Sequence, residues 1–185
     1  MSADVSVRLA WPDDAPAVAD VQLRTWRAEY ADVLGDDVVA GLDPEGVAER
    51  WRASVVAPPE ARMRVLVALE RATVRGYAVV HPCFDPDADR VADGEVGGFV
   101  VDPEHRRAGH GSRLLQAAVD TLRADRFTRA VWWLSSTDDV LRRFLVESGW
   151  ETDGAHRELQ DETGRAIKQV RLHTALTDES ELTEG

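Results

Sequence analysis

The most informative stretch of this sequence reads Glu95-Val-Gly-Gly-Phe-Val-Val-Asp-Pro-Glu-His-Arg-Arg-Ala-Gly-His-Gly-Ser-Arg-Leu-Leu115. Its first part, residues 96–101, is an apolar run rich in β-branched side chains, which predicts a buried strand. A turn of small and basic residues, 106–112, follows this run. Leucine, alanine and valine then recur at helical spacing up to Leu122, which predicts an amphipathic helix.

This order of elements is typical of an anion-binding site: a strand, then a basic turn with two glycines, then a helix. The first N–H groups of a helix have no partner within the helix, and the helix dipole favours negative charge there. Gly109 and Gly111 carry no Cβ, so the backbone can approach a phosphate closely and adopt a positive φ where needed. Arg106, Arg107 and Arg113 could add charge-assisted hydrogen bonds. A surface loop that happens to begin a helix can show the same glycine spacing, so spacing alone leaves both interpretations open.

Length and composition predict one globular domain. The chain has 185 residues, of which 44% are hydrophobic, and single domains commonly reach this length. We expect the domain to cover residues 1–176 and an acidic, frayed tail to cover residues 177–185. The lone cysteine, Cys83, excludes an intramolecular disulfide and fits a reducing compartment. The first eight residues do not resemble a signal peptide and no run is long enough to span a membrane, so we expect a cytoplasmic protein with no membrane partner.

The net charge of −12, from 34 acidic and 22 basic residues, narrows the class of partner. Nucleic acid is disfavoured because duplex binding needs a concentrated positive surface. An acidic surface attracts cationic substrates such as amines, although solubility alone also accounts for it.

The remaining patterns predict a mixed α/β fold with the order β-α-α-β-β-β-α-β-α-β-β. Four aspartates in the loop 82–94 suggest a calcium site, but the glycine and the late glutamate of an EF-hand loop are not at their positions. The segment 31–43 has no clear periodicity and is expected to be irregular. The predicted elements are strand 5–9, a helix from Asp13 or Asp14 to Tyr30, helix 44–56, a hairpin of 64–70 and 75–81, strand 96–101, helix 112–125, strand 130–134, a helix capped by Thr137 or Asp138 with Val140, Leu141, Phe144 and Leu145 as its apolar face, and a final hairpin of 155–159 and 166–173.

Arg106-Arg107-Ala108-Gly109-His110-Gly111 resembles Arg/Gln-x-x-Gly-x-Gly/Ala, the acetyl-coenzyme A signature of the GNAT superfamily of N-acetyltransferases. The preceding run from Glu95 looks like the fourth strand of that family, and the following Ser112-Arg-Leu-Leu looks like its helix. The segments 131–134 and 141–150 look like its fifth strand and the helix after it. The resemblance covers roughly residues 5–174 and is strongest over 95–150.

This resemblance implies a fold with splayed central strands and acetyl-coenzyme A as co-substrate, without a metal. It implies transfer of the acetyl group to a primary amine of a small molecule or a protein, by direct attack in a ternary complex. Family members often form homodimers. The cofactor-binding positions implied are Phe99, Val100 and Val101 along the strand, Arg106, Arg107, Ala108, Gly109, His110, Gly111 and Ser112 in the turn, and Thr137 before the next helix.

Glu95 is the implied catalytic base, because the family frequently has a glutamate there that removes the amine proton, commonly through water. The competing interpretation is that Glu95 only marks the strand edge. The resemblance places Trp26, Tyr30 and Trp51 at the acceptor substrate. By itself, the amphipathic pattern of their helices indicates only that these helices pack against another part of the protein. The histidines and the single cysteine make no metal-ligand pattern.

One departure from the family affects the leaving group. Many members have a tyrosine directly after the phenylalanine of the last helix, but here Leu145 follows Phe144 and cannot donate a proton. A non-catalytic acyl-coenzyme A binding or sensing module therefore remains the alternative function. A P-loop or a dinucleotide fold is disfavoured, because neither glycine fingerprint is complete. Candidates for the missing acid are Tyr30, Tyr77, His110, Ser135, Ser136 and Thr137.

Overall fold

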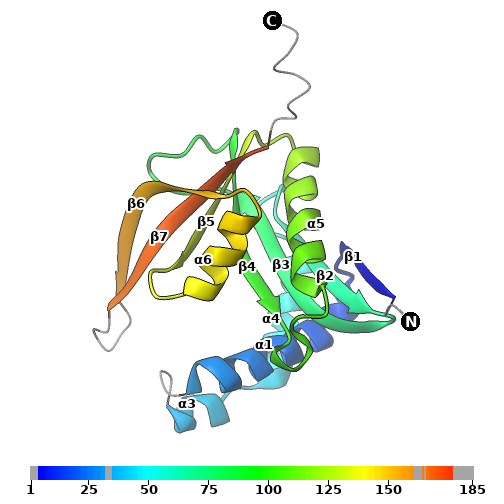
Figure 1. The fold of residues 1–185 in the computed structure, drawn as a ribbon. Coiled ribbons are helices and arrows are strands. Elements are labelled where there is room, and N and C mark those ends of the chain that lie inside the picture. Colours follow the sequence, from blue (N-terminus) through cyan, green and yellow to red (C-terminus); the bar gives the residue numbers. More distant parts are fainter. Residues whose placement is uncertain (1–3, 32–34, 161–163, 165, 177–185) are drawn as a thin grey trace, which may run out of the picture. The chain divides into compact units, whose positions relative to one another are not determined.

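The computed structural model describes residues 4–31, 35–160, 164 and 166–176 (Figure 1). It has a mixed seven-stranded sheet in the order β1-β2-β3-β4-β5-β7-β6. The predicted α/β class and the order of the strands and longer helices are confirmed. Within the described residues, the structure adds the short helix α3 in the segment expected to be irregular, and the 3-10 helices η1 and η2. The elements are β1 Val5–Leu9, η1 Pro12–Asp14, α1 Ala15–Glu29, α3 Asp36–Ala40, α4 Pro44–Val56, β2 Arg64–Glu70, β3 Thr73–Pro82, β4 Asp93–Val101, η2 Pro103–His105, α5 His110–Ala124, β5 Arg129–Ser135, α6 Asp139–Glu147, β6 Glu151–Gln160 and β7 Ala166–Ala175.

The sheet contains both antiparallel and parallel strand pairs. β1, β2 and β3 pair antiparallel, as do β5, β7 and β6, whereas β4 and β5 pair parallel. A parallel pair needs a crossover connection, and α5 supplies it between β4 and β5. The ladder of β4 with β5 is short, joining Asp93–Glu95 to Arg129–Val131, and both strands continue beyond it.

The chain divides into two compact units, each described below by itself. One unit comprises Met1–His81 and Gly98–Thr121, and the other comprises Pro82–Gly97 and Leu122–Gly185. The expectation of a single domain over residues 1–176 stays a prediction. The expected tail at 177–185 and most of the expected turn at 161–164 lie outside the described residues.

The first unit has its core where α1 packs on the β2–β3 hairpin. Val18 and Val21 of α1 meet alternate residues of both strands, including Val67 and Tyr77. A second apolar cluster joins α1 to α4 through Ala19, Leu23, Val47 and Ala48. The N-cap of α4 is Asp43, whose carboxylate accepts hydrogen bonds from the first-turn amides of Glu45 and Gly46 at 3.1 Å.

In the second unit, β6 and β7 form a long hairpin beside β5 (Figure 1). Trp132 of β5 and Trp150 pack edge to face, with ring centroids 5.8 Å apart. Leu145 of α6 is fully buried, but Val140 is 82% exposed, so its predicted place on the apolar face of this helix was wrong. Val140 lies in the first turn, where the spacing of apolar residues has only begun.

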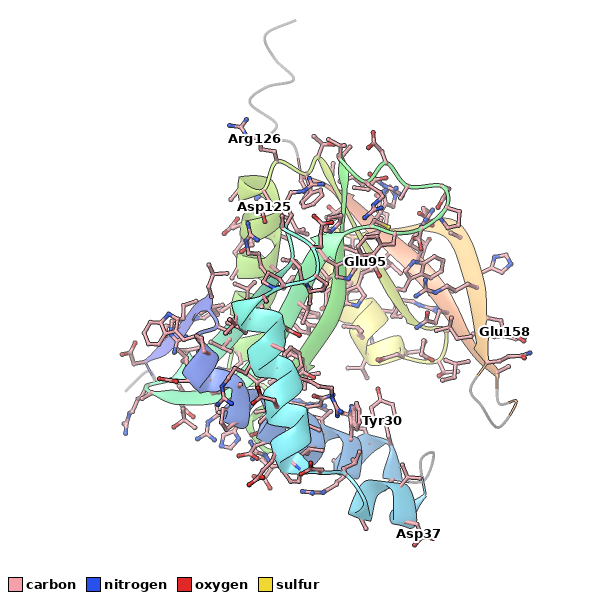
Figure 2. All side chains as sticks on the ribbon, turned by 180° about the vertical axis from the view of Figure 1, so that it is seen from behind. Tyr30, Asp37, Glu95, Asp125, Arg126 and Glu158 are labelled. Carbon is pink, nitrogen blue, oxygen red and sulfur yellow. The ribbon has the colours of Figure 1, made fainter. Side chains whose placement is uncertain are left out.

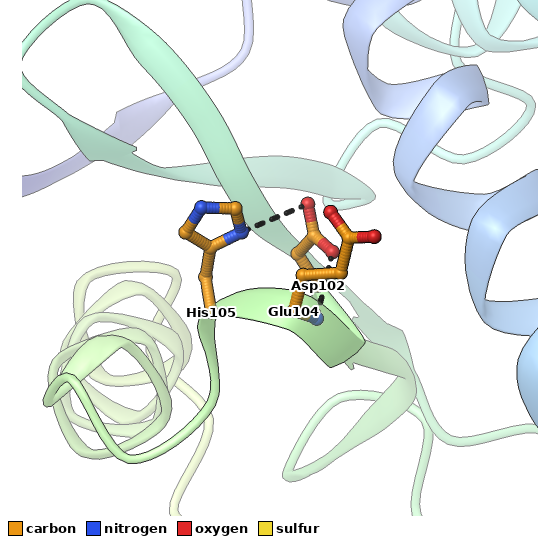
Figure 3. Close-up of side chains that lie close together, drawn as sticks. All are labelled: Asp102, Glu104 and His105. Carbon is orange, nitrogen blue, oxygen red and sulfur yellow. Dashed lines mark hydrogen bonds and ion pairs between the residues drawn. The ribbon is translucent and has the colours of Figure 1, made fainter.

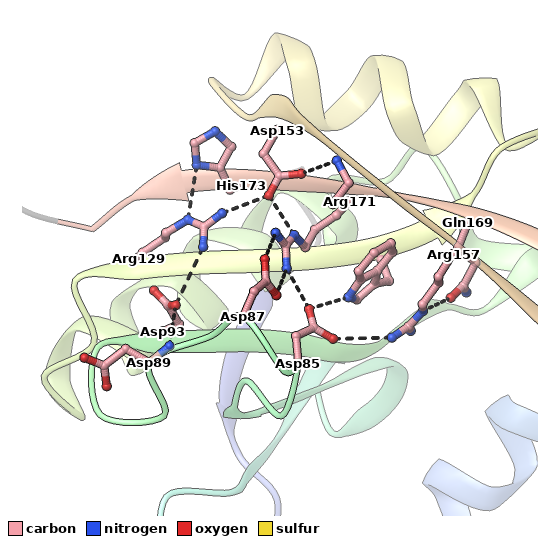
Figure 4. Close-up of polar contacts among 12 residues, drawn as sticks. Asp85, Asp87, Asp89, Asp93, Arg129, Asp153, Arg157, Gln169, Arg171 and His173 are labelled. Atoms are coloured by element: carbon pink, nitrogen blue, oxygen red, sulfur yellow. Dashed lines mark hydrogen bonds and ion pairs between the residues drawn. The ribbon is translucent and has the colours of Figure 1, made fainter.

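A buried arginine organises the polar side of the second unit (Figure 4). Arg171 of β7 donates to Asp153 at 2.6 Å, to Asp85 at 3.0 Å and to Asp87 at 2.7 Å. Trp133 also donates its indole N–H to Asp85, at 2.8 Å. The loop between β3 and β4 is therefore attached to the β6–β7 hairpin, and two of the aspartates that suggested a calcium site, Asp85 and Asp87, lie against arginines.

These contacts change the acidity of the aspartates. Hydrogen bonding to Arg171 lowers the pKa of Asp87 to about 2. Burial alone would raise the pKa of Asp153, but hydrogen bonds from the Ala155 amide and from Arg171 lower it below its usual value. A carboxylate with a lowered pKa in the folded state stabilises the fold above its unfolded pKa, near 4, and this contribution is lost as pH falls towards the folded pKa.

Replacing Arg171 by methionine is expected to lower the free energy of unfolding by about 3–5 kcal/mol, the cost of removing one partner from a buried ion pair. The side chains of Asp85 and Asp153 are only 10% and 11% exposed. Without Arg171 they would keep only their more exposed partners, Arg157 at 3.5 Å and Arg129 at 2.9 Å. Urea denaturation at pH 7 measures the loss, and the variant should lose less further stability than the wild type between pH 4 and pH 2.

The matched control is Arg157→Met, which removes a guanidinium 3.5 Å from the same Asp85 but with 36% side-chain exposure. Its loss is expected to stay at or below about 1 kcal/mol. Equal losses in the two variants would contradict the assignment of Arg171 as the organising cation.

Candidate functional site: the loop between β4 and α5

The loop that follows β4 begins at Asp102, which is fully buried. The Asp102 amide donates to the Arg75 carbonyl at 2.7 Å, and its carboxylate accepts from the Glu104 amide at 3.2 Å and from Arg24 at 2.7 Å. Burial alone would raise the pKa of Asp102, but the bonds from Arg24 and from the Glu104 amide lower it below its usual value. Asp102 is therefore ionised at neutral pH and fixes the start of the loop.

The loop reverses direction through two residues with positive φ, Arg107 at 63° and Gly109 at 83°. Gly109 therefore uses the conformational freedom that the sequence suggested, whereas Gly111 does not. A Cβ added at Gly109 would meet no atom within 4 Å, so the space beside the backbone there is open.

The N-terminus of α5 opens directly from this loop. The first backbone hydrogen bond into the helix runs from the Arg113 amide to the Gly109 carbonyl, at 3.3 Å. The amides of His110, Gly111 and Ser112 precede that bond, and such first-turn amides have no partner within a helix. An open backbone with three donors at the positive end of a helix dipole fits a diphosphate.

The three arginines expected to contact a phosphate differ in their surroundings. Arg106 forms an ion pair with Glu29 of α1, and Arg113 donates to the carbonyl of Val5 at 2.5 Å. Arg107 has no ion-pair or hydrogen-bond partner among the residues that the structure describes. To contact a phosphate as expected, Arg106 and Arg113 must leave their present partners, whereas Arg107 has none to leave among the described residues.

His110 has a buried ring, which leaves its backbone amide as the group available to a ligand. The residue is 1% exposed, and neither ring nitrogen has a hydrogen-bond partner among the described residues. Burial lowers the pKa of His110, with smaller effects from Glu70, Arg75, His105 and Arg113. The imidazole is therefore neutral at pH 7, and its burial makes it a poor proton donor for a leaving thiolate.

Substituting leucine for His110 is expected to raise the free energy of unfolding by about 1 kcal/mol at pH 7.5, because a buried donor without a partner costs roughly 1–3 kcal/mol. The gain should grow as pH falls below about 6.5, since the unfolded wild-type chain then binds a proton that the folded chain resists. Urea denaturation at pH 7.5 and pH 5.5 measures both effects. The exposed His156 gives the control, His156→Leu, and an unchanged pH dependence in His110→Leu would contradict the prediction.

The other predicted cofactor positions flank this loop. Phe99, Val100 and Val101 lie in the last part of β4 and are half-buried, while Ala108 and Ser112 are exposed. A Cβ added at Gly111 would lie 3.8 Å from Val101 Cγ2, so the strand end and the start of α5 are in van der Waals range. Strand and loop therefore form one continuous candidate surface, although the individual roles stay predictions.

Glu95 is the third residue of β4, not its first, and its side chain is half-buried (Figure 2). It is the last residue of β4 in the ladder with β5, opposite Val131. Glu95 is near enough to Cys83 to affect it electrostatically, although burial is the main cause that raises the pKa of this thiol to about 12. Glu95 thus lies where the pairing of β4 with β5 ends, and its catalytic role stays a prediction.

At the start of α6, Thr137 and Asp138 have different roles. Asp138 is the N-cap, since its carboxylate accepts from the Leu141 amide at 3.0 Å. The exposed Thr137 shares a hydrogen bond of 3.0 Å with the Ser135 hydroxyl. Thr137 is therefore free of the capping role, which leaves its predicted contact with the cofactor open.

The predicted acceptor residues occupy α1 and α4 in the first unit. Trp51 packs edge to face on Tyr77 at 4.8 Å between centroids and donates its indole N–H to Gln22 at 2.6 Å. Trp26 is half-buried, and Tyr30 lies exposed at the end of α1 (Figure 2). Trp51 therefore has a packing role, which does not exclude a second face towards a substrate.

Sequence reasoning missed one cluster on η2, formed by Asp102, Glu104 and His105 (Figure 3). One ligand-type atom from each lies within 4.8 Å of the others, and the spacing Asp-x-Glu-His was the available signal. His105 Nδ1 lies 3.4 Å from Asp102 Oδ2. Arg24 already pairs with Asp102 and would compete with a cation there, and the absence of a metal stays a prediction.

Comparison with known proteins identifies the family of this loop and its flanking strands. The family model described as "Acetyltransferase (GNAT) family" matches residues 21–150. The chain belongs to the GNAT family of acetyltransferases. No curated protein sequence matches this GNAT chain significantly. In the described part of the chain, no helix is both long and apolar enough to cross a membrane.

Solved structures support the GNAT fold across nearly the whole chain. The yncA protein of Salmonella typhimurium, solved with its cofactor acetyl-CoA, is 21% identical with a TM-score of 0.69, over 95% of this chain and 96% of that chain. Ribosomal-protein-alanine N-acetyltransferase from Brucella melitensis is 19% identical with a TM-score of 0.70, over 92% and 99%. PaiA N-acetyltransferase from Thermoplasma acidophilum, solved with coenzyme A, is 14% identical with a TM-score of 0.67, over 93% and 99%.

Proposed function

We propose that the protein transfers an acetyl group from acetyl-coenzyme A to a primary amine of a small molecule or a protein. The observation that carries this proposal is the loop at the start of α5, where two positive-φ residues open the backbone and first-turn amides lack partners within the helix. Family membership supports acetyl transfer, and two similar structures contain acetyl-CoA or coenzyme A.

Acyl transfer to an amine needs a held acyl donor, a neutral amine, a donor for the developing oxyanion and a stable leaving thiolate. Acetyl-coenzyme A supplies the activated acetyl group. The amides of His110, Gly111 and Ser112 bind its diphosphate, while the main chain of β4 near Val100 bonds the pantetheine as an added strand would. Glu95 removes the amine proton, directly or through one water, before attack in a ternary complex.

The leaving group distinguishes this chain from many relatives. Leu145 is fully buried and has no proton to give. Of the candidate acids, His110 is buried and Tyr77 is 5% exposed, with burial the main cause that raises its pKa. Neither group suits proton donation, so the thiolate leaves with other stabilisation or takes its proton from Tyr30, Ser135, Ser136 or Thr137.

Leu145 is also the observation that favours the second candidate, a non-catalytic acyl-coenzyme A sensor. Thiol release from acetyl-coenzyme A, measured across a panel of amines and of peptides with free amino groups, tests the two functions. Amine-dependent thiol release supports the enzyme. Calorimetric binding of acetyl-coenzyme A without turnover across the panel supports the sensor, and absence of binding rejects both. A homodimer and a cytoplasmic location stay predictions.

A further inference from the structure

Two ion pairs connect α1 to the first part of the loop between β4 and α5. Arg24 donates to Asp102 at 2.7 Å, and Glu29 pairs with Arg106. All four residues belong to the first compact unit. The helix α1 is therefore attached to both ends of the segment 102–106.

The two ion pairs differ in burial and therefore in how readily they break. The Asp102 side chain is 1% exposed and also accepts from the Glu104 amide, so its pair with Arg24 is costly to break. The side chains of Arg106 and Glu29 are 48% and 35% exposed. An ion pair that water reaches on both sides contributes little and exchanges readily. If the outer pair opens, the inner pair still attaches the loop to α1.

Arg106 is the first residue of the glycine motif whose amides are proposed to bind a diphosphate. A guanidinium bonds carboxylates and phosphates through the same planar set of N–H groups. Glu29 and a phosphate therefore compete for Arg106. The neighbouring Arg107 needs no exchange, because it has no ion-pair partner in the described part of the chain.

We propose that Arg106 exchanges Glu29 for the diphosphate of the cofactor, so that Glu29 is a positioning residue that restrains the loop and lowers cofactor affinity. The inference rests on the proposed function. The dianionic diphosphate is the stronger partner, and Glu29 returns to Arg106 when the product coenzyme A leaves. The Glu29 carboxylate thus weakens the binding of both acetyl-coenzyme A and coenzyme A, and it favours release of the coenzyme A product.

Calorimetric titration of the full chain with coenzyme A tests this exchange. Glu29→Gln is expected to bind about two- to fivefold more tightly than the wild type at low ionic strength, the range of an exposed ion pair, and Glu29→Asp should restore much of the restraint. Arg106→Gln should weaken binding, and adding Glu29→Gln to it should give no gain. Glu49→Gln is the matched control, because it removes the same charge from an exposed pair 2.8 Å from Arg52 on α4.

A gain in Glu29→Gln that exceeds that of Glu49→Gln and disappears without Arg106 supports the exchange. Affinity equal to or below that of the wild type would overturn it, because Glu29 would then hold Arg106 in a productive position or play no part. A gain that persists in the Arg106→Gln background would also overturn it, since the effect would be one of net charge. Failure of the wild-type chain to bind coenzyme A would instead reject the proposed function, and the inference with it.

Discussion

Glu95→Gln is expected to lower kcat about 10²–10⁴-fold near pH 7, the usual contribution of a general base, while the affinity for coenzyme A stays at the wild-type value. Glutamine keeps the size and hydrogen-bonding shape of the side chain but cannot accept the amine proton. The fold should survive, because Glu95 is half-buried at the end of the β4–β5 ladder and its backbone pairing with Val131 is unchanged.

The pH dependence separates a base from a structural carboxylate. An alkyl amine has a pKa near 10, so at high pH a growing fraction is neutral without help from the protein. The rate of Glu95→Gln should therefore approach that of the wild type as pH rises towards 10. Thiol release at saturating acetyl-coenzyme A, with calorimetry for coenzyme A affinity, measures both quantities.

The control for this substitution is Glu158→Gln, an exposed glutamate on β6 (Figure 2). It removes the same charge from the same compact unit and should leave kcat unchanged. A rate for Glu95→Gln within a few-fold of the wild type at pH 7 would reject Glu95 as the base and leave it as a strand-edge residue. No measurable rate in the wild type would favour the sensor.

The elements with strong local signals were predictable from the sequence. The helix at residues 44–56 has its cap, Asp43, and its proline in sequence, and the observed α4 has the predicted bounds. The strand β1 was predictable from its alternation of apolar and polar residues, and β2 from its apolar run. The helix α3 was not predictable, because five residues give too short a window for periodicity.

The site was predictable as a motif, but its long-range contacts were not. The residues around Gly109 identify the loop because its backbone requirements are local. The pairs Arg24–Asp102 and Arg106–Glu29 join residues more than 70 positions apart, and nothing in a single sequence indicates which arginine meets which carboxylate. The burial of His110 was equally hidden, since a histidine beside two glycines is expected on the surface until the packing of α5 is known.

Gly109→Ala is expected to weaken coenzyme A binding about tenfold to hundredfold, the loss that corresponds to one charge-assisted hydrogen bond. Gly109 has a φ of 83°, in the left-handed region where a side chain costs about 1–2 kcal/mol. No atom lies within 4 Å of the added Cβ, so a clash within the described protein does not contribute. The strain turns the Gly109 peptide and moves the following amides away from the diphosphate.

Gly154→Ala provides a matched control from the same chain. Gly154 also has a φ of 83° and no atom within 4 Å of an added Cβ, but it lies in β6. Both variants should lose a similar free energy of unfolding, about 1–2 kcal/mol, by urea denaturation. Only Gly109→Ala should lose affinity in calorimetric titration with coenzyme A. Equal affinities in the two variants would show that the backbone of this loop does not bind the diphosphate, and the proposed function would lose the observation that carries it.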